Sequence, residues 1–144
     1  MQPLSILIIG AGKLGRESGQ RLKDAGHRLT FVEKDHQLAE KAKELFGERV
    51  FAGDGCDPKV LEHAGIGSAQ VIIAATGDDE DNLIIAELAH HVFEVQYVIT
   101  RVNRPENQWL FTAHRGVDTA FCPVTMMADF IKTEIDKQTA KTHN

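Results

Sequence analysis

Three glycines that follow an apolar run place the strongest constraint on this chain. Residues 5–9 read Ser-Ile-Leu-Ile-Ile, without the polar alternation of a half-exposed strand, as is typical of strands buried on both faces of a parallel sheet. Gly10, Gly12 and Gly15 follow in the spacing GxGxxG. In this spacing the first glycine permits a tight turn, the second admits a pyrophosphate, and the third lets a helix pack closely. The stretch therefore predicts a phosphate-binding loop at a helix N-terminus.

An acidic residue lies where such a loop needs one. An isolated GxGxxG also arises when glycine simply ends a strand and opens a helix, so its context decides the interpretation. Here a helical pattern follows to about residue 25, and a second strand, residues 29–32, ends at Glu33. The spacing is close to the roughly twenty residues expected for the carboxylate that binds the ribose hydroxyls. Glu33 favours NAD over NADP by repelling a 2′-phosphate, and the adjacent Lys34 is a further candidate contact.

Composition fits one globular domain. The chain has 144 residues, of which 42% are hydrophobic and 26% charged. Its formal net charge of -5 provides no overall attraction for nucleic acid. No apolar run reaches the length of a membrane span, and the start lacks a signal pattern, so we expect a cytoplasmic chain that reaches a membrane only through a partner. Cys56 and Cys122 form neither a CxxC motif nor a disulfide framework, and we expect no metal site.

Strand-like and helical segments alternate along the chain. This alternation predicts an α/β, Rossmann-like, doubly wound parallel sheet of six strands in the order 3-2-1-4-5-6, with an additional C-terminal helix. The ligand is expected across the carboxyl ends of the first and fourth strands, where the order reverses. The expected strands are 5–9, 29–32, 49–52, 71–75, 97–101 and 119–122, and the expected helices are 13–25, 36–46, 59–64, 82–93, 105–116 and 125–135.

The last expected helix lies beyond the elements that such a sheet needs. Within 125–135, an apolar stripe contains Met127, Phe130, Ile131 and Ile135. The stripe packs either on another subunit or missing lobe, or on its own domain, and the pattern does not choose between them. We expect the binding domain to occupy residues 1–135 and residues 136–144 to form a polar tail that frays.

Motifs outside the glycine loop resemble those of one family. Residues 53–66 read GDGCDPKVLEHAGI and match the pattern GDGxDPxxLxxAGI. With the glycine loop, Glu33, residues 75–82 (ATGDDEDN) and residues 101–103 (RVN), this stretch resembles the RCK, or KTN (TrkA-N), nucleotide-binding domain. The resemblance covers about residues 4–135, and the GDGxDP stretch is its most diagnostic part because generic dehydrogenase domains lack it.

This resemblance implies a regulator rather than an enzyme. Such domains act on the cytoplasmic face of potassium channels and K⁺ transporters, bind NAD(H) or ATP, ADP or AMP, and perform no chemistry on the ligand. The implied partners are a membrane K⁺ channel or transporter subunit and further copies of the chain, as a homodimer or larger assembly. Many members continue into a C-terminal lobe that these 144 residues do not include, so we expect either a single-lobe protein or a piece of a longer regulator.

The resemblance also implies a role for each site position. The glycine loop takes phosphate, Glu33 takes the ribose, residues 54–56 border the adenine, and residues 75–77 face the phosphates or the distal nucleoside. Cys56 is often Thr in this family and Glu33 is often Asp, and neither change removes a needed group. The expected site residues are Gly10, Ala11, Gly12, Lys13, Leu14, Gly15, Glu33, Lys34, Asp54, Gly55, Cys56, Ala75, Thr76, Gly77 and Arg101.

Several polar residues also have plainer structural interpretations. Lys13 either neutralises phosphate or is a solvated loop lysine, and Arg101 either contacts phosphate or pairs with a carboxylate. The acidic run 78–81 either holds a divalent cation or caps a helix, with capping favoured. Arg16 is favoured for a surface ion pair over phosphate. Cys56 is favoured as an inert residue over a redox-sensitive thiol.

Two rival functions share the glycine turn. One is the cofactor-binding half of an NAD-dependent oxidoreductase, but the predicted fold uses almost all 144 residues and leaves no segment for a substrate pocket. The other is a domain that binds S-adenosylmethionine, which the full GxGxxG, the ribose acid and the GDGxDP stretch disfavour.

Overall fold

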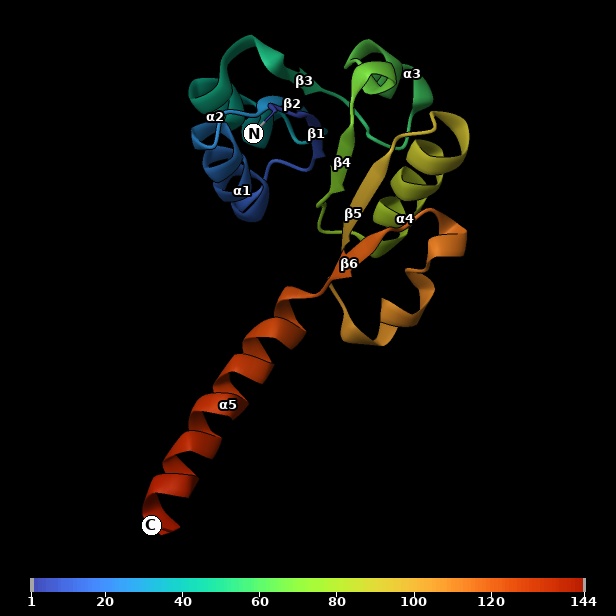
Figure 1. Ribbon diagram of the computed structural model, residues 1–144. Coiled ribbons are helices and arrows are strands. Elements are labelled where there is room, and N and C mark those ends of the chain that lie inside the picture. Colours follow the sequence, from blue (N-terminus) through green and yellow to red (C-terminus); the bar gives the residue numbers. More distant parts are fainter. Residues whose placement is uncertain (1, 144) are drawn as a thin grey trace.

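The computed structural model describes residues 2–143, which are built around a six-stranded, all-parallel sheet (Figure 1). The strand order is β3-β2-β1-β4-β5-β6, so the predicted doubly wound topology is confirmed. The order reverses between β1 and β4, and a ligand crevice is expected outside the carboxyl ends of these strands. The strands are β1 (Ser5–Ile9), β2 (Arg28–Glu33), β3 (Val50–Ala52), β4 (Val71–Ala74), β5 (Tyr97–Arg101) and β6 (Thr119–Phe121).

Helices cover both faces of the sheet. α1 and α2 pack on one face and α3 and α4 on the other, as Figure 1 shows. The α-helices are α1 (Lys13–Asp24), α2 (His36–Phe46), α3 (Pro58–His63), α4 (Asp79–Glu87) and α5 (Pro123–His143). Shorter helical segments are η1 (Gly47–Arg49), η2 (Ile66–Ser68), η3 (Leu88–Val92), η4 (Pro105–Leu110) and η5 (Ala113–Arg115).

Strand β1 shows why its residues are apolar without alternation. Ile6 and Ile8 belong to the core beneath α1 and α2, whereas Leu7 and Ile9 belong to the core beneath α3 and α4. All four side chains are at most 4% exposed. Burial of an aliphatic side chain of this size contributes about 1.5–3 kcal/mol. The two cores therefore fix β1, and the glycine loop at its end, in the middle of the sheet.

Two helix starts follow the predicted capping chemistry. The Asp35 carboxylate accepts a hydrogen bond from the Leu38 amide at 3.0 Å, and Asp57 accepts one from the Lys59 amide at 2.9 Å. Pro58 is the first residue of α3, as expected of a residue without an amide hydrogen. Both predicted caps are confirmed.

Two segments differ from their predicted form. The helix expected at 105–116 is instead the two 3₁₀ segments η4 and η5, and Trp109 is 75% exposed. A continuous α-helix there would need an apolar face to bury, and the large Trp109 ring does not supply one. The helix expected at 82–93 begins earlier, at Asp79, because the Asp78 carboxylate caps it by accepting from the Asp81 amide, and its last part, η3, is a π-helix.

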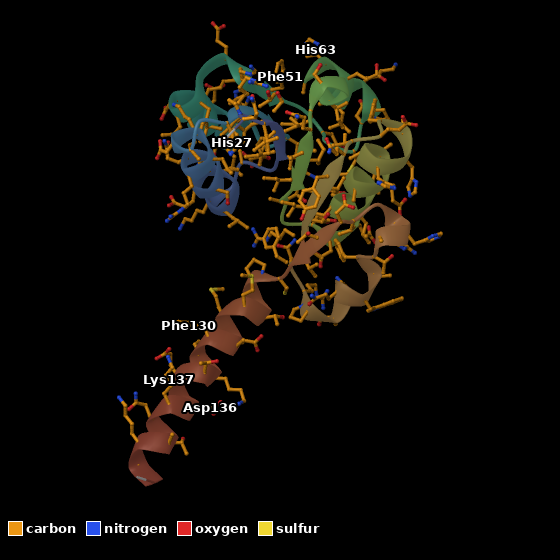
Figure 2. The ribbon with its side chains drawn as sticks, viewed as in Figure 1. His27, Phe51, His63, Phe130, Asp136 and Lys137 are labelled. Atoms are coloured by element: carbon orange, nitrogen blue, oxygen red, sulfur yellow. The ribbon has the colours of Figure 1, made fainter. Side chains whose placement is uncertain are left out.

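The C-terminal helix is longer than predicted and stands apart from the sheet (Figure 1). Helix α5 runs to His143, beyond the predicted helix end at residue 135, and residue 144 lies outside the described part. Lys132–Asp136 and Lys137–Glu134 ion pairs link successive turns, and Figure 2 shows Phe130, Asp136 and Lys137 along this projecting helix. Its apolar stripe does not pack on its own domain. No helix in residues 2–143 combines the length and apolar character needed to cross a membrane.

Candidate functional site

A cavity of about 400 Å³ lies at the carboxyl ends of the strands, at the point where the strand order reverses. Its volume is in the range of small-molecule sites. Most of the predicted site residues line it: Gly10, Gly12, Glu33, Lys34, Asp54, Gly55, Cys56, Ala75, Thr76, Gly77 and Arg101. The sequence interpretation missed several lining residues, namely Ile9, Val32, Leu38, Gly53, Asp78, Asp81 and Ile85.

The glycine loop forms one rim of the cavity. Gly10 has φ of +109°, and a Cβ atom there would lie 2.6 Å from the Ala75 carbonyl oxygen. Only glycine therefore allows this turn and the close approach of the loop to the end of β4. A Cβ atom at Gly15 would overlap the Gly10 carbonyl, so α1 packs directly on the turn.

Gly12 leaves open space at the start of α1. A Cβ atom built there meets no other atom within 4 Å, and Gly12 lines the cavity. Gly12 is the N-cap residue, no side chain caps the helix, and its first turn contains no acidic residue. Backbone amides and the positive end of the helix dipole therefore remain available to an anion.

Glu33 braces the glycine loop from the neighbouring strand. Its Oε1 accepts a hydrogen bond from the Ala11 amide at 2.6 Å, and its Oε2 accepts one from the Asp35 amide at 2.8 Å. The residue is 8% exposed and lines the cavity. Each carboxylate oxygen has two lone pairs, so this carboxylate retains acceptor capacity for ligand hydroxyls.

Arg101 brings positive charge to the opposite rim. It is the last residue of β5 and lines the cavity beside Thr76 and Gly77. Its Nε atom is buried and has no hydrogen-bond partner within residues 2–143. A buried donor without an acceptor is costly, and an anionic ligand would satisfy it.

An ion pair joins the two sides of the cavity. Lys34, just after β2, places its Nζ 3.3 Å from Oδ2 of Asp81 in α4. The hydrogen bond and the negative charge of Asp81 raise the pKa of Lys34 above its usual range. The sequence interpretation treated Asp81 as part of a helix-capping run, because nothing in the sequence shows that β2 and α4 meet there.

One domain family matches most of the chain. The TrkA-N domain family matches residues 6–123. This chain belongs to the TrkA-N domain family. The Trk system potassium uptake protein TrkA of Mycobacterium tuberculosis strain H37Rv is 35% identical over 134 residues, which are 92% of this chain and 60% of that protein. This TrkA-N domain therefore spans less than two thirds of the length of that relative.

Solved structures show the same fold as this TrkA-N domain. The TrkA-N domain of the inner membrane protein ybaL from Escherichia coli has a TM-score of 0.80 at 17% identity, with 92% of this chain and 96% of that one covered. The GsuK channel bound to NAD has a TM-score of 0.79 at 21% identity, with 97% of this chain and 24% of that one covered. The AMP-bound Kef CTD of Shewanella denitrificans has a TM-score of 0.77 at 22% identity, with 94% of this chain and 81% of that one covered.

Part of the predicted loop in this TrkA-N domain does not line the cavity. Ala11 and Gly15 are buried behind the loop, Leu14 is half-buried in α1, and Lys13 is exposed. Arg16 does not form the surface ion pair that was favoured for it within residues 2–143. Its Nη1 donates to the Ala11 carbonyl at 2.7 Å and so supports the loop. Sequence spacing gave no signal for this contact, because it depends on how the loop folds back over the helix.

The acidic run has structural roles at the start of α4. Asp78 caps the helix, as the capping interpretation predicted. The Asp79 carboxylate accepts hydrogen bonds from the backbone amides of Asn103 and Arg104 and from the side chains of Asn103 and Asn107. Partial burial of Asp79 acts to raise its pKa, but these hydrogen bonds outweigh it and hold the pKa below its usual range.

The environment of Cys56 disfavours a thiolate. Its Sγ donates to the Asp81 carbonyl at 3.8 Å. Burial, followed by the negative charges of Asp81 and Asp54, raises the pKa of the thiol to about 12. Cys56 is therefore protonated at neutral pH, which supports its interpretation as an unreactive lining residue.

Proposed function

We propose that this chain is a regulatory domain or subunit that binds NAD(H), ATP, ADP or AMP and controls a potassium channel or transporter. The observation that carries the proposal is the meeting of three groups in one cavity. These groups are the open backbone at Gly12, the Glu33 carboxylate and the Arg101 Nε, which has no hydrogen-bond partner within residues 2–143. Each suits one part of a nucleotide, and they lie where parallel α/β sheets bind ligands.

Each part of the ligand has a proposed position. The phosphates lie at the α1 N-terminus and reach toward Arg101, and the ribose hydroxyls bind Glu33. The adenine lies beside Asp54, Gly55 and Cys56 at the end of β3. Structures of the same fold bound to NAD and to AMP support this range of ligands.

The partner is proposed from the relatives. The Mycobacterium tuberculosis protein is a Trk system potassium uptake protein. We infer that this chain acts on the cytoplasmic face of the membrane, held there by a K⁺ channel or transporter subunit, and that it binds nucleotide without turnover. Steady oxidation of NADH with a simple oxo-acid substrate would instead favour the cofactor-binding half of an oxidoreductase.

Gly12 and Gly67 offer a matched test of nucleotide binding. Neither position has an atom within 4 Å of a built Cβ, and neither has positive φ, so both accept alanine without strain. Calorimetry with NAD⁺, NADH, ATP, ADP and AMP is expected to show binding by the wild type and by Gly67→Ala. Gly12→Ala is expected to bind at least about tenfold more weakly, because its methyl group occupies the phosphate approach. Equal affinity of Gly12→Ala and the wild type would contradict the proposed site.

We also propose that the chain forms a homodimer through α5. Six large apolar side chains on this helix are 50–66% exposed: Val124, Met126, Met127, Phe130, Ile131 and Ile135. The sheet offers a complementary surface. Ile73 of β4 and Ile99 of β5 lie opposite each other on the sheet face that α1 and α2 cover over the other strands. Tyr97 and Phe121 lie beside them on the same face. In the described chain no helix packs over β5 and β6 on that face (Figure 1).

The size of these surfaces suits two copies, each laying α5 on the sheet of the other. Burial of the six α5 side chains, at roughly 100 Å² each, removes about 1,200 Å² of accessible surface when both copies are counted. The covered sheet face adds to this area, so the total reaches the size of a standard protein–protein interface.

Light scattering is expected to give a dimer for the wild type and for Val92→Glu, a control at an exposed apolar residue of η3. Phe130→Glu and Tyr97→Lys are each expected to give monomers. A monomeric wild type would refute the dimer.

A further inference from the structure

Asn82 is a completely buried side chain whose amide uses all of its hydrogen-bonding capacity. It lies in the first turns of α4 and is 0% exposed. Its Oδ1 accepts from the Thr76 amide at 3.1 Å and from the Thr76 hydroxyl at 2.6 Å. Its Nδ2 donates to the carbonyls of Thr76 at 3.0 Å and Arg101 at 3.1 Å. An amide has two lone pairs and two donor hydrogens, so none remains unpaired.

These four bonds join the ends of two neighbouring strands. The β4–β5 ladder ends at the pair Ala74–Thr100. Beyond it, Thr76 leads into the turn after β4, and Arg101 is the last residue of β5. Past the last backbone pair of β4 and β5, the Asn82 side chain therefore connects the two strand ends by hydrogen bonds. Asn103 adds a second tie, because its Nδ2 also donates to the Thr76 carbonyl at 3.0 Å.

Both tied residues line the cavity, whereas Asn82 does not. We propose that Asn82 is a positioning residue for the phosphate side of the nucleotide site. It fixes the backbone from which the Arg101 guanidinium extends, and it fixes the Thr76–Gly77 turn opposite the glycine loop. Glu33 ends β2, the proposed adenine border follows β3, and neither receives any of these bonds. The inference rests on the proposed nucleotide binding, and it predicts a loss confined to ligands that carry phosphate.

The test compares ADP with adenosine in an NMR titration, which also measures weak binding. Asn82→Leu keeps the number and branching of the side-chain heavy atoms and removes all four bonds. It is expected to weaken ADP binding by about tenfold or more while adenosine affinity stays within about twofold. Arg101→Met is expected to weaken ADP binding in the wild-type background. In Asn82→Leu it is expected to cause little further loss of ADP affinity, because the mispositioned Arg101 guanidinium has already lost its contact with the phosphate. Ile66→Val, a core change in η2, is the control for a general loss of stability.

The outcomes separate this inference from the proposed function. Equal losses for ADP and adenosine, or fully additive effects of Asn82→Leu and Arg101→Met, would show that Asn82 only stabilises the fold. If Asn82→Leu does not fold, the wild-type spectrum decides: the Asn82 side-chain amide signals are expected to shift with ADP and not with adenosine, and unchanged signals would overturn the inference. If the wild type binds neither ligand, the proposed function fails and this inference fails with it.

Discussion

The Glu33 carboxylate holds the backbone amide of Ala11 at 2.6 Å, so a side chain at the end of β2 fixes the glycine loop at the end of β1. The other carboxylate oxygen holds the Asp35 amide and thereby the start of α2. The residue predicted to bind the ribose therefore also builds the loop predicted to bind the phosphate. Loop geometry and sugar recognition are linked through one buried carboxylate.

Replacement of Glu33 is expected to impair both stability and binding. Glu33→Gln presents one amide nitrogen, a donor, to a backbone amide that needs an acceptor. We expect it to lower the free energy of unfolding by about 1–3 kcal/mol in urea titrations. Binding of NAD⁺ and ADP, measured by calorimetry, is expected to weaken at least about tenfold. Glu44→Gln, on the exposed surface of α2, is the control, and unaltered nucleotide binding by Glu33→Gln would remove this residue from the site.

The fold could be predicted because its signals are local. The uninterrupted apolar run of β1, the turn glycine Gly10 and the caps Asp35 and Asp57 each follow from neighbouring residues in the chain. The alternation of segments then leaves few topologies for a parallel sheet. The prediction differed from the structure in two segments. The exposed Trp109 ends up in a 3₁₀ segment, and α5 keeps its helical form beyond its apolar stripe.

The candidate site was predictable from its motifs but not from its cross-links. Gly12, Glu33 and Arg101 lie at the carboxyl ends of three different strands, and the topology alone brings them to one edge of the sheet. The pairs Arg16–Ala11, Lys34–Asp81 and Asn82–Arg101 depend on the direction of individual side chains. Asn82 in particular reads as an ordinary polar helix residue, because no sequence pattern shows that it is buried.

The ion pair between Lys34 and Asp81 predicts a shifted titration. A lysine whose pKa is raised on folding stabilises the folded protein. This contribution is fully present below the ordinary lysine pKa of 10.5 and is lost as the pH rises through the higher pKa of the folded state. NMR titration of the Lys34 side chain is expected to give a midpoint above 10.5 in the wild type and a lower one in Asp81→Asn. Glu40→Gln, which removes a different exposed pair, is expected to leave Lys34 unchanged. An unshifted wild-type midpoint would show that the pair does not form in solution.

Cys56 is expected to react slowly. With a pKa of about 12, the thiolate fraction of Cys56 at pH 8 is about a thousandfold below that of an ordinary cysteine. A Cys122→Ala background isolates this thiol, and mass spectrometry follows its alkylation by iodoacetamide. Native protein is expected to react far more slowly than protein unfolded in urea, with the rate rising toward pH 11. Rapid native alkylation at pH 8 would instead support a redox-sensitive thiol.

Asp79 is expected to make the loop after β5 sensitive to acid. Its hydrogen bonds from Asn103, Arg104 and Asn107 favour the charged form, so its folded pKa lies below the ordinary value of 3.8. A depressed carboxylate contributes stability that is present above that value and is lost as the pH falls through the folded pKa. Asp79→Asn is therefore expected to cost about 1–3 kcal/mol at pH 7, because its amide hydrogens face donors.

The difference between the wild type and Asp79→Asn isolates this effect from the titration of other acids. Urea unfolding from pH 7 to pH 2.5 is expected to show a constant difference down to about pH 4 and a shrinking one below it, since protonated Asp79 also presents a donor to these partners. Asp129→Asn, on the exposed surface of α5, is expected to match the wild type throughout. A difference independent of pH would mean that the carboxylate contributes through its shape and packing rather than its charge.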